Sequence, residues 1–305
     1  MDKQANAANA LREDITRSII GMLENGVRPW ARSWQSDDAP VFPSRLPIRH
    51  SGEYYQGINV LILWMAAAEA GYQQPKWMTF KQAQELGGVV RKGEKATKVC
   101  YSSKFLKSDS EGEDQYIFYT KVYSVFNVEQ IDGLPESCFI NIAPPALVVV
   151  GEKAEMTRNP LVDAFFDRIG ANISYGGGSA YYSPKSDAIK MPKFEDFNTP
   201  EDFYSTLIHE YVHWTSAESR LNRKIGVFGT EAYAEEELVA ELGAAFLCAE
   251  LGISATVRED HASYIASWIK VLKNDKRAIF EAASKAQKAV GFLHEQSAIR
   301  AERVG

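Results

Sequence analysis

Two histidines spaced four residues apart constrain the fold of this chain more than any other sequence feature. His209 and His213 stand in the segment IHEYVHW, which follows a strong helix start with Thr199 as N-cap and Pro200 in the first turn. Residues i and i+4 of a helix lie on one face about one turn apart, so both imidazoles can bind one tetrahedral ion. The sequence therefore predicts a helix over residues 200–218 that carries part of a metal site.

Glu210 stands between these histidines and completes the pattern HExxH. Its carboxylate cannot point at the same spot as the two imidazoles, but it can reach a water molecule beside the ion and take its proton. This is the general-base role of the glutamate in HExxH hydrolases, so we interpret Glu210 as catalytic. The alternative is that these residues form only a polar helix face.

A second helix, predicted over residues 231–251, supplies acidic side chains. Glu237 and Glu241 share one face, and two stacked carboxylates repel each other unless a cation joins them. A His₂Glu site provides that cation, with one carboxylate as ligand and the other holding a histidine N–H. We favour Glu237 as the ligand of Zn²⁺, or of another divalent metal such as Mn²⁺, but Glu241 remains a candidate ligand. Glu235 and Glu236 are expected on a solvated face, and the alternative is that all these acids are exposed.

Two further segments are candidates for a part in the chemistry. A third helix, predicted over residues 260–287, opens with His261 and Tyr264, and either side chain could donate a hydrogen bond to an oxyanion. A packing role is the alternative for both. Residues 179–191 predict two short strands that turn at residues 183–184, and their edge could bind an extended peptide. A simple surface hairpin is the alternative.

The N-terminal half predicts a mixture of helices and strands. Helices are expected over residues 11–24 and 57–70 and after Thr79, and strands over residues 98–105 and 115–126, with a third candidate at 139–142. Residues 27–50 read as an irregular arm because four prolines interrupt them.

A proline-containing stretch without periodicity divides the chain. We therefore expect two domains, residues 1–135 and 156–305, joined by a linker over residues 136–155. Strands followed by long helices favour the α+β class for the whole protein.

Composition excludes several classes of protein. The three cysteines form no CxxC pair, so neither a disulfide framework nor a thiolate zinc cluster is indicated, and a reducing cytoplasm fits best. The N-terminus lacks the apolar core of a secretory signal. The longest apolar stretch, residues 58–68, is too short to cross a bilayer, which takes about 20 residues. No membrane role is expected.

Basic and aromatic residues gather in one segment although the net charge of the chain is −6. Residues 71–107 hold eight Lys/Arg and only two acids, together with rings such as Phe80 and Tyr101. Bases that follow a phosphate backbone and rings that stack on nucleobases are the two requirements of single-strand binding. The candidate DNA-binding residues are Trp30, Trp34, Tyr54, Tyr55, Lys76, Trp77, Lys81, Arg91, Lys92 and Lys95. The alternative is that most rings belong to the core and the lysines are merely solvated.

Several motifs in order resemble one family over roughly residues 10–290. The N-terminal segments are PWARSW, YQGINVLILW, WMTFKQAQELGGVVRKGEKATKV and VFNVEQI, and the C-terminal ones are IHEYVHWT, AEEELVAELGAAFL and HASYIASWIK. They resemble the two domains of ArdC-type antirestriction proteins, and domains related to the first occur in some plasmid primases. The resemblance implies a single-stranded-DNA-binding domain followed by a zincin-like metallopeptidase domain of the gluzincin-like type. It further implies a plasmid-encoded bacterial protein that protects incoming DNA from host restriction during conjugation, in the recipient cytoplasm.

Three hypotheses follow from these features. The first is a DNA-binding metallopeptidase, whose protein substrate could be a host restriction component. The second is a protein that masks DNA without proteolysis and in which the metal is structural. The third, a metal-dependent nuclease, ranks last because the C-terminal half is acidic and HExxH usually serves acyl hydrolysis.

Overall fold

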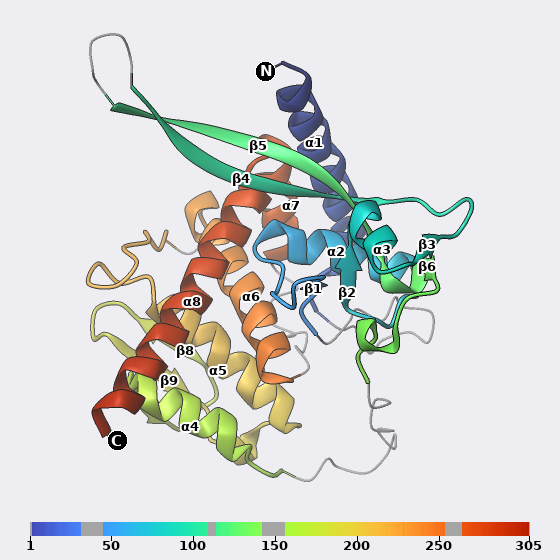
Figure 1. The fold of residues 1–305 in the computed structure, drawn as a ribbon. Helices are drawn as coiled ribbons and strands as arrows, with labels where there is room; N and C mark the ends of the chain where they lie inside the picture. Colours follow the sequence, from blue (N-terminus) through green and yellow to red (C-terminus); the bar gives the residue numbers. More distant parts are fainter. Residues whose placement is uncertain are drawn as a thin grey trace.

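The computed structural model describes residues 2–31, 45–108, 114–141, 156–227, 229–253 and 264–304, and these form an α+β protein as predicted (Figure 1). The helices are α1 (Asp2–Glu24), α2 (Ile58–Ala70), α3 (Phe80–Glu85), α4 (Pro160–Ile169), α5 (Pro200–Trp214), α6 (Glu231–Leu251), α7 (Ile265–Asn274) and α8 (Ala278–Val304). The strands are β1 (Ile48–Arg49), β2 (Lys76–Met78), β3 (Val89–Val90), β4 (Thr97–Ser108), β5 (Asp114–Asn127), β6 (Ile131–Asp132), β7 (Asn172–Tyr175), β8 (Tyr181–Ser183) and β9 (Ala188–Met191). Short 3₁₀ turns η1 (Val128–Gln130), η2 (Glu136–Cys138) and η3 (Phe194–Asp196) complete the described elements.

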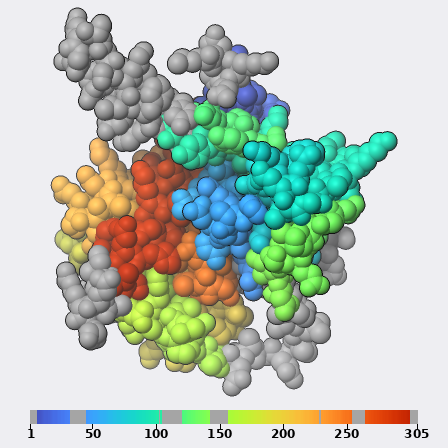
Figure 2. Space-filling model, viewed as in Figure 1, coloured from blue at the N-terminus to red at the C-terminus, as the bar shows by residue number. Residues whose placement is uncertain are grey.

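The N-terminal half is built on a four-stranded sheet in the order β1-β2-β5-β4. Strands β4 and β5 form a long antiparallel hairpin that projects from the body of the molecule (Figure 1). Helix α2 contacts β4 on one side and α8 on the other, which agrees with its sequence, since a helix that is apolar on nearly all sides must be buried. Figure 2 shows the residues around α2 between α8 and the residues that follow α2 in the sequence.

The C-terminal half is a helical layer with a small sheet. Helix α5 packs against α6, and α8 packs against both α6 and α4. The three-stranded sheet has the order β7-β9-β8, with β7 parallel and β8 antiparallel to β9, and both β8 and β9 contact α5.

One hydrophobic core joins the two halves within the described residues. Ile19 of α1 and Leu61 of α2 belong to the same buried cluster as Leu242 of α6 and Trp268 of α7. Polar contacts at its border add to this junction, because Lys276 Nζ lies 2.8 Å from Glu13 Oε1. The halves are therefore packed together and not merely tethered.

The structure differs from the sequence-based expectations at several elements. The third C-terminal helix is two helices, α7 and α8, because Asp275 leaves helical geometry and its side chain accepts a hydrogen bond from the Arg277 backbone N–H at 2.8 Å. Helix α1 begins at Asp2 instead of Leu11, and β7 was not predicted. Residues 139–141 form no strand. Most of the expected linker, residues 142–155, and most of the arm, residues 32–44, lie outside the described residues, so the domain limits stay a prediction.

A glycine controls how closely α5 and α6 approach. A Cβ added at Gly243 would lie 2.8 Å from Cγ2 of Val212, which is fully buried and β-branched and therefore has little freedom to move. We expect Gly243→Ala to lower the free energy of unfolding by about 1–3 kcal/mol through overpacking. Urea denaturation of the full chain measures this change.

Gly291 provides the matched control, because it also lies in a helix but a Cβ there would meet nothing within 4 Å. Gly291→Ala is expected to be neutral or to stabilise by up to about 1 kcal/mol, from helix propensity alone. Equal stabilities of the two variants would refute the close helix contact at Gly243.

Candidate metal centre

Three buried side chains from α5 and α6 converge on one point. The Nε2 atoms of His209 and His213 lie 3.1 Å apart, and the two carboxylate oxygens of Glu237 lie 3.5 Å and 3.4 Å from them. One donor atom from each residue lies within 4.8 Å of the other two, which is close enough for the three side chains to hold one divalent metal. The predicted ligands His209, His213 and Glu237 therefore come together as a candidate metal site, and three protein ligands are typical of catalytic zinc sites.

Local sequence signals set both ligand helices. In α5 the Thr199 hydroxyl accepts a hydrogen bond from the Asp202 backbone N–H at 3.1 Å, which caps the helix as predicted. In α6 the Thr230 hydroxyl accepts from the Tyr233 backbone N–H at 3.3 Å, and Gly252 ends the helix in a left-handed conformation. Helix α6 has the predicted limits, whereas α5 ends four residues earlier than expected, at Trp214.

Glu241 lies behind His209 and outside the ligand set. Its Oε1 is 3.7 Å from His209 Nδ1, the ring nitrogen that faces away from the convergence point. Its Oε2 accepts a hydrogen bond from the indole N–H of Trp30 at 3.1 Å, and Arg28 Nη1 lies 3.9 Å away. At 3.7 Å the contact with His209 is longer than a hydrogen bond, but it places Glu241 where a carboxylate supports a ligating imidazole.

Glu236 supports the second imidazole in the same way. The expectation of a solvated face is wrong for Glu236, which is buried, and holds for Glu235, which is exposed. Glu236 Oε1 lies 3.4 Å from His213 Nδ1, and both carboxylate oxygens accept hydrogen bonds from Arg223, at 3.0 Å and 2.8 Å. Arg223 lies in the loop between the two helices and supplies the charge that makes burial of Glu236 possible.

These contacts determine the protonation of the site when no metal is bound. Burial disfavours a charged imidazole, but hydrogen bonds to Glu236 and Glu237 overcome it and raise the pKa of His213 to about 10. The same contacts lower the pKa of Glu237 and of Glu236 despite the burial of both carboxyl groups. Without a metal these carboxylates favour protonation of the imidazoles, so metal binding competes with protons.

A cavity of about 170 Å³ opens over the metal ligands. Glu210 lines it from α5, Tyr181 and Tyr182 from β8, Tyr233 from α6, and Tyr264 from the start of α7. The predicted candidates Glu210 and Tyr264 thus share the cavity with the ligands, whereas His261 lies outside the described residues.

Sequence reasoning missed Tyr233. It stands four residues before Glu237 in α6, and this spacing, which places two residues on one helix face, is the signal that could have found it. Burial, followed by hydrogen bonds with Tyr264 and Glu237, raises the pKa of the Tyr233 phenol. Tyr233 therefore keeps its proton at neutral pH and remains a hydrogen-bond donor beside the ligands.

Burial excludes three of the predicted aromatic residues from DNA binding. Trp30, Tyr55 and Trp77 are only 2%, 7% and 1% exposed, so they pack inside the protein and cannot stack on DNA. Lys76 is partly buried and donates a hydrogen bond to the backbone of Ser137. Trp34 lies outside the described residues. The predicted residues that the structure leaves exposed are Tyr54, Lys81, Arg91, Lys92 and Lys95.

Two family profiles match successive parts of the chain. The N-terminal domain of anti-restriction factor ArdC matches residues 9–126, and a zincin-like metallopeptidase matches residues 160–285. The solved structure of the antirestriction ArdC protein from the R388 plasmid is similar in its metal-free form, with 40% identity, a TM-score of 0.79 and coverage of 95% of this chain and 98% of that one. The Mn(II)-bound form of that protein has a TM-score of 0.77 and the same identity, and the match covers 94% of this chain and 98% of that one.

Curated relatives agree with this match. The uncharacterized protein y4eC of Sinorhizobium fredii is 35% identical over 97% of this chain and 95% of its own length. The DNA primase TraC of Escherichia coli is 34% identical over 95% of this chain, which corresponds to only 27% of TraC. In the described part of the chain, the helices are too short or too polar to cross a membrane.

The contact between Trp30 and Glu241 makes a testable prediction about metal affinity. Trp30→Phe removes the indole N–H that holds Glu241 and leaves an aromatic ring beside Trp268, whose ring centre lies 5.8 Å from that of Trp30. Loss of the partner of a ligand typically costs 10–100-fold in metal affinity, and Trp30 acts one contact further away through Glu241, so we expect a loss of up to about 10-fold. Titration of the full chain with Zn²⁺ or Mn²⁺ against a competing chelator measures it.

Trp64→Phe is the matched control. Trp64 is also buried and donates its indole N–H to a backbone carbonyl, that of Arg45 at 2.9 Å, and its ring neighbour among the described residues is Phe246 and not a metal ligand. This variant loses the same group from a core tryptophan and should bind metal like the wild type. Indistinguishable affinities of the two variants would show that Trp30 does not orient the site.

Proposed function

Because the chain belongs to the ArdC family of antirestriction proteins, we propose that it protects incoming plasmid DNA from host restriction by combining single-stranded-DNA binding with metal-dependent proteolysis. The N-terminal half binds the strand, and the zincin-like half hydrolyses a protein, for which a host restriction component is the expected substrate. The protein acts in the cytoplasm of the recipient bacterium.

The cavity over the metal ligands carries the proteolytic part of this proposal. A divalent ion bound by the triad would supply a Lewis acid that polarises the scissile carbonyl group. Glu210 takes the proton of the attacking water and delivers it to the leaving amine. Tyr233 and Tyr264 line the same cavity and donate hydrogen bonds to the developing oxyanion.

Strand β8 suits the binding of an extended peptide. It lies at the edge of its sheet and pairs only with β9 among the described strands. Residues of β8 and its flanks, namely Ala180, Tyr181, Tyr182 and Pro184, line the cavity. A substrate strand added at this edge would run past the metal ligands and Glu210.

The types of the ligands favour zinc, whereas the structure of a relative favours manganese as the bound ion. Two imidazoles and one carboxylate are a common catalytic zinc site. The ArdC protein from R388 has been solved with Mn(II) bound. We therefore propose Zn²⁺ or Mn²⁺ as the ion of this site.

A structural role of the metal is the second candidate function. In that case the protein masks DNA without proteolysis. The hydrogen bond from Trp30 to Glu241 favours this alternative, because it connects the N-terminal half to the support of a metal ligand. An ion at the triad would then stabilise the junction of the two halves.

Glu210→Ala separates the two candidate functions. It leaves all three ligands in place but removes the general base, which typically contributes 10²–10⁴-fold to hydrolysis. The proteolytic proposal predicts that protection is lost when plasmid transfer into restricting and non-restricting recipients is compared. Glu235→Ala is the control, since Glu235 is exposed on α6 and should be dispensable. Full protection by Glu210→Ala, with metal bound, would support masking instead.

Single-strand binding is tested by its dependence on salt. Each phosphate contact by a lysine or arginine adds about −0.7 to the slope of log K against log salt concentration. Replacement of the exposed residues Lys81, Lys92 and Lys95 by alanine should weaken binding and flatten this slope by up to about 2. Lys185→Ala, in the exposed turn after β8, should leave the slope unchanged. Absent or salt-independent binding by the wild type would refute the DNA-binding half of the proposal.

A further inference from the structure

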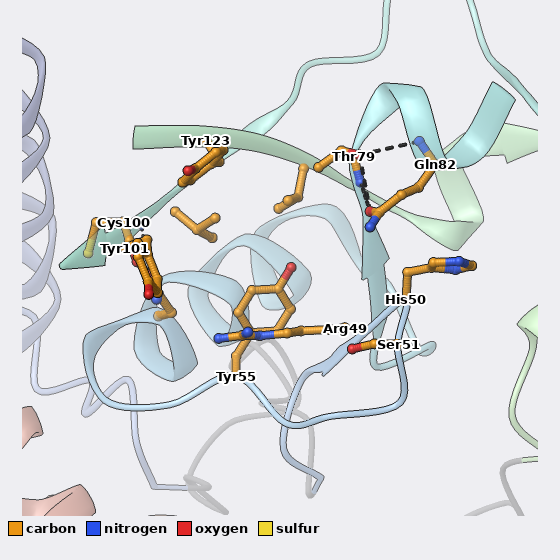
Figure 3. A pocket seen from close by; sticks show the side chains of 12 residues that line it. Arg49, His50, Ser51, Tyr55, Thr79, Gln82, Cys100, Tyr101 and Tyr123 are labelled. Carbon is orange, nitrogen blue, oxygen red and sulfur yellow. Dashed lines mark hydrogen bonds between the residues drawn. The ribbon is translucent and has the colours of Figure 1, made fainter. Parts of the chain in front are cut away.

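A second cavity, of about 340 Å³, lies in the N-terminal half, and none of the metal ligands lines it. It is bounded by β4 and β5, by the start of α3 and by the segment from Arg49 to Tyr55 (Figure 3). The register pairs Val99 with Tyr123 and Tyr101 with Lys121, so these four side chains share one face of the hairpin. This face forms one side of the cavity.

The cavity has an apolar floor and an aromatic mouth. Val99, Val125 and Tyr55 are buried and make the floor. Tyr101 and Tyr123 stand at the mouth and are 48% and 44% exposed, and the described part of the chain places no other ring against either. They are diagonal neighbours on adjacent strands, a spacing of about 7–8 Å between backbones that long aromatic side chains can span. Two exposed rings over an apolar floor form a stacking surface for a flat, partly polar ligand.

Hydrogen-bonding groups face the rings from the other side. Figure 3 shows Thr79 and Gln82 opposite Tyr101 and Tyr123, with Arg49 lying against Tyr55 between them. Gln82 uses its amide oxygen to accept from the Thr79 backbone N–H at 2.8 Å, and no described residue accepts from its amide N–H groups. The Nε of Arg49 is likewise buried without a partner among the described residues. Both groups are donors that a ligand with carbonyl or ring-nitrogen acceptors would satisfy.

Two contacts restrain Arg49 before any ligand arrives. Its guanidinium lies 5.3 Å from the centre of the Tyr55 ring, and its Nη1 lies 3.7 Å from Glu53 Oε2. A donor held in this way loses little conformational entropy on binding.

The charge of the cavity suits a ligand that carries phosphates. Its lining contains Arg49 and His50 and no Asp or Glu. Lys121 lies opposite Tyr101 on the same face of the hairpin, and the exposed Lys81 lies in the adjoining helix α3, where its Nζ is 3.6 Å from Glu85 Oε1. Flanking phosphates of a bound nucleotide would therefore meet positive charge on two sides.

We propose that this cavity receives one unstacked base of single-stranded DNA, which stacks on Tyr101 and Tyr123 and accepts hydrogen bonds from Gln82 and Arg49. The inference rests on the proposed binding of single strands and names the part of the surface that holds a base. A duplex does not satisfy the cavity, because its bases are already stacked and paired.

The test uses the full chain and a labelled oligo-dT, with affinity measured by fluorescence anisotropy. Removal of a stacking ring costs about 5- to 100-fold in affinity, so Tyr101→Ala and Tyr123→Ala should each weaken binding by this factor. Tyr101→Phe keeps the ring and should bind like the wild type. Tyr175→Ala is the matched control, since Tyr175 in β7 is also 48% exposed but lies outside the cavity. Unfolding midpoints of all variants establish that they are folded.

A second measurement reports on the base itself. A 2-aminopurine placed within the oligonucleotide should lose fluorescence on binding to the wild type, because it stacks on tyrosine, but not on binding to the Tyr101→Ala, Tyr123→Ala double variant. Wild-type affinity of both alanine variants for the strand, with single-strand binding intact, would overturn the base site and leave the proposed function standing. Tighter binding of free thymidine monophosphate than of the strand would assign the cavity to a mononucleotide and also overturn the proposal. A wild type that binds no single strand would overturn both the base site and the DNA-binding function.

Discussion

The balance of charge buried between α5 and α6 is the constraint on which the rest of the structure depends. Glu236, Glu237 and Glu241 are all buried beside two histidines, and an uncompensated buried carboxylate costs several kcal/mol. Arg223 neutralises Glu236, Arg28 and the indole N–H of Trp30 lie against Glu241, and Glu237 is left for a proton on the imidazoles or for a metal ion. The same buried charges therefore determine both the chemistry of the site and the stability of the α5–α6 pair.

The ligands could be predicted from sequence because every signal for them is local. Helix caps, the spacing of His209 and His213, and the periodicity of α6 lie within one or two helical turns, where the rules of helix geometry apply directly. Their supports could not be predicted in the same way. Glu236 is buried only because Arg223 folds back from the loop, and Trp30 reaches Glu241 from 211 residues away in the sequence.

The exposure of the aromatic side chains in the N-terminal half could not be predicted from local sequence either. Composition identifies an aromatic and basic segment but does not say which rings face solvent, and the predicted stacking residues Trp30 and Trp77 are core residues. Tyr101 and Tyr123 are exposed on one face because of the β4–β5 register, which depends on pairing between strands. The sequence did not predict the break between α7 and α8. Its local signal is Asp275, and the capping hydrogen bond from the Arg277 backbone N–H to this side chain is seen only in the structure.

The hydrogen bond between Trp30 and Glu241 has a thermodynamic consequence for the two halves. Trp30 lies in the segment after α1 in the N-terminal half, whereas Glu241 lies beside a metal ligand of the other half. Any event that displaces the tryptophan changes the free energy of metal binding, and by reciprocity the ion changes the free energy of that event by the same amount. Metal binding in one half and the packing of Trp30 in the other are then linked through this one hydrogen bond.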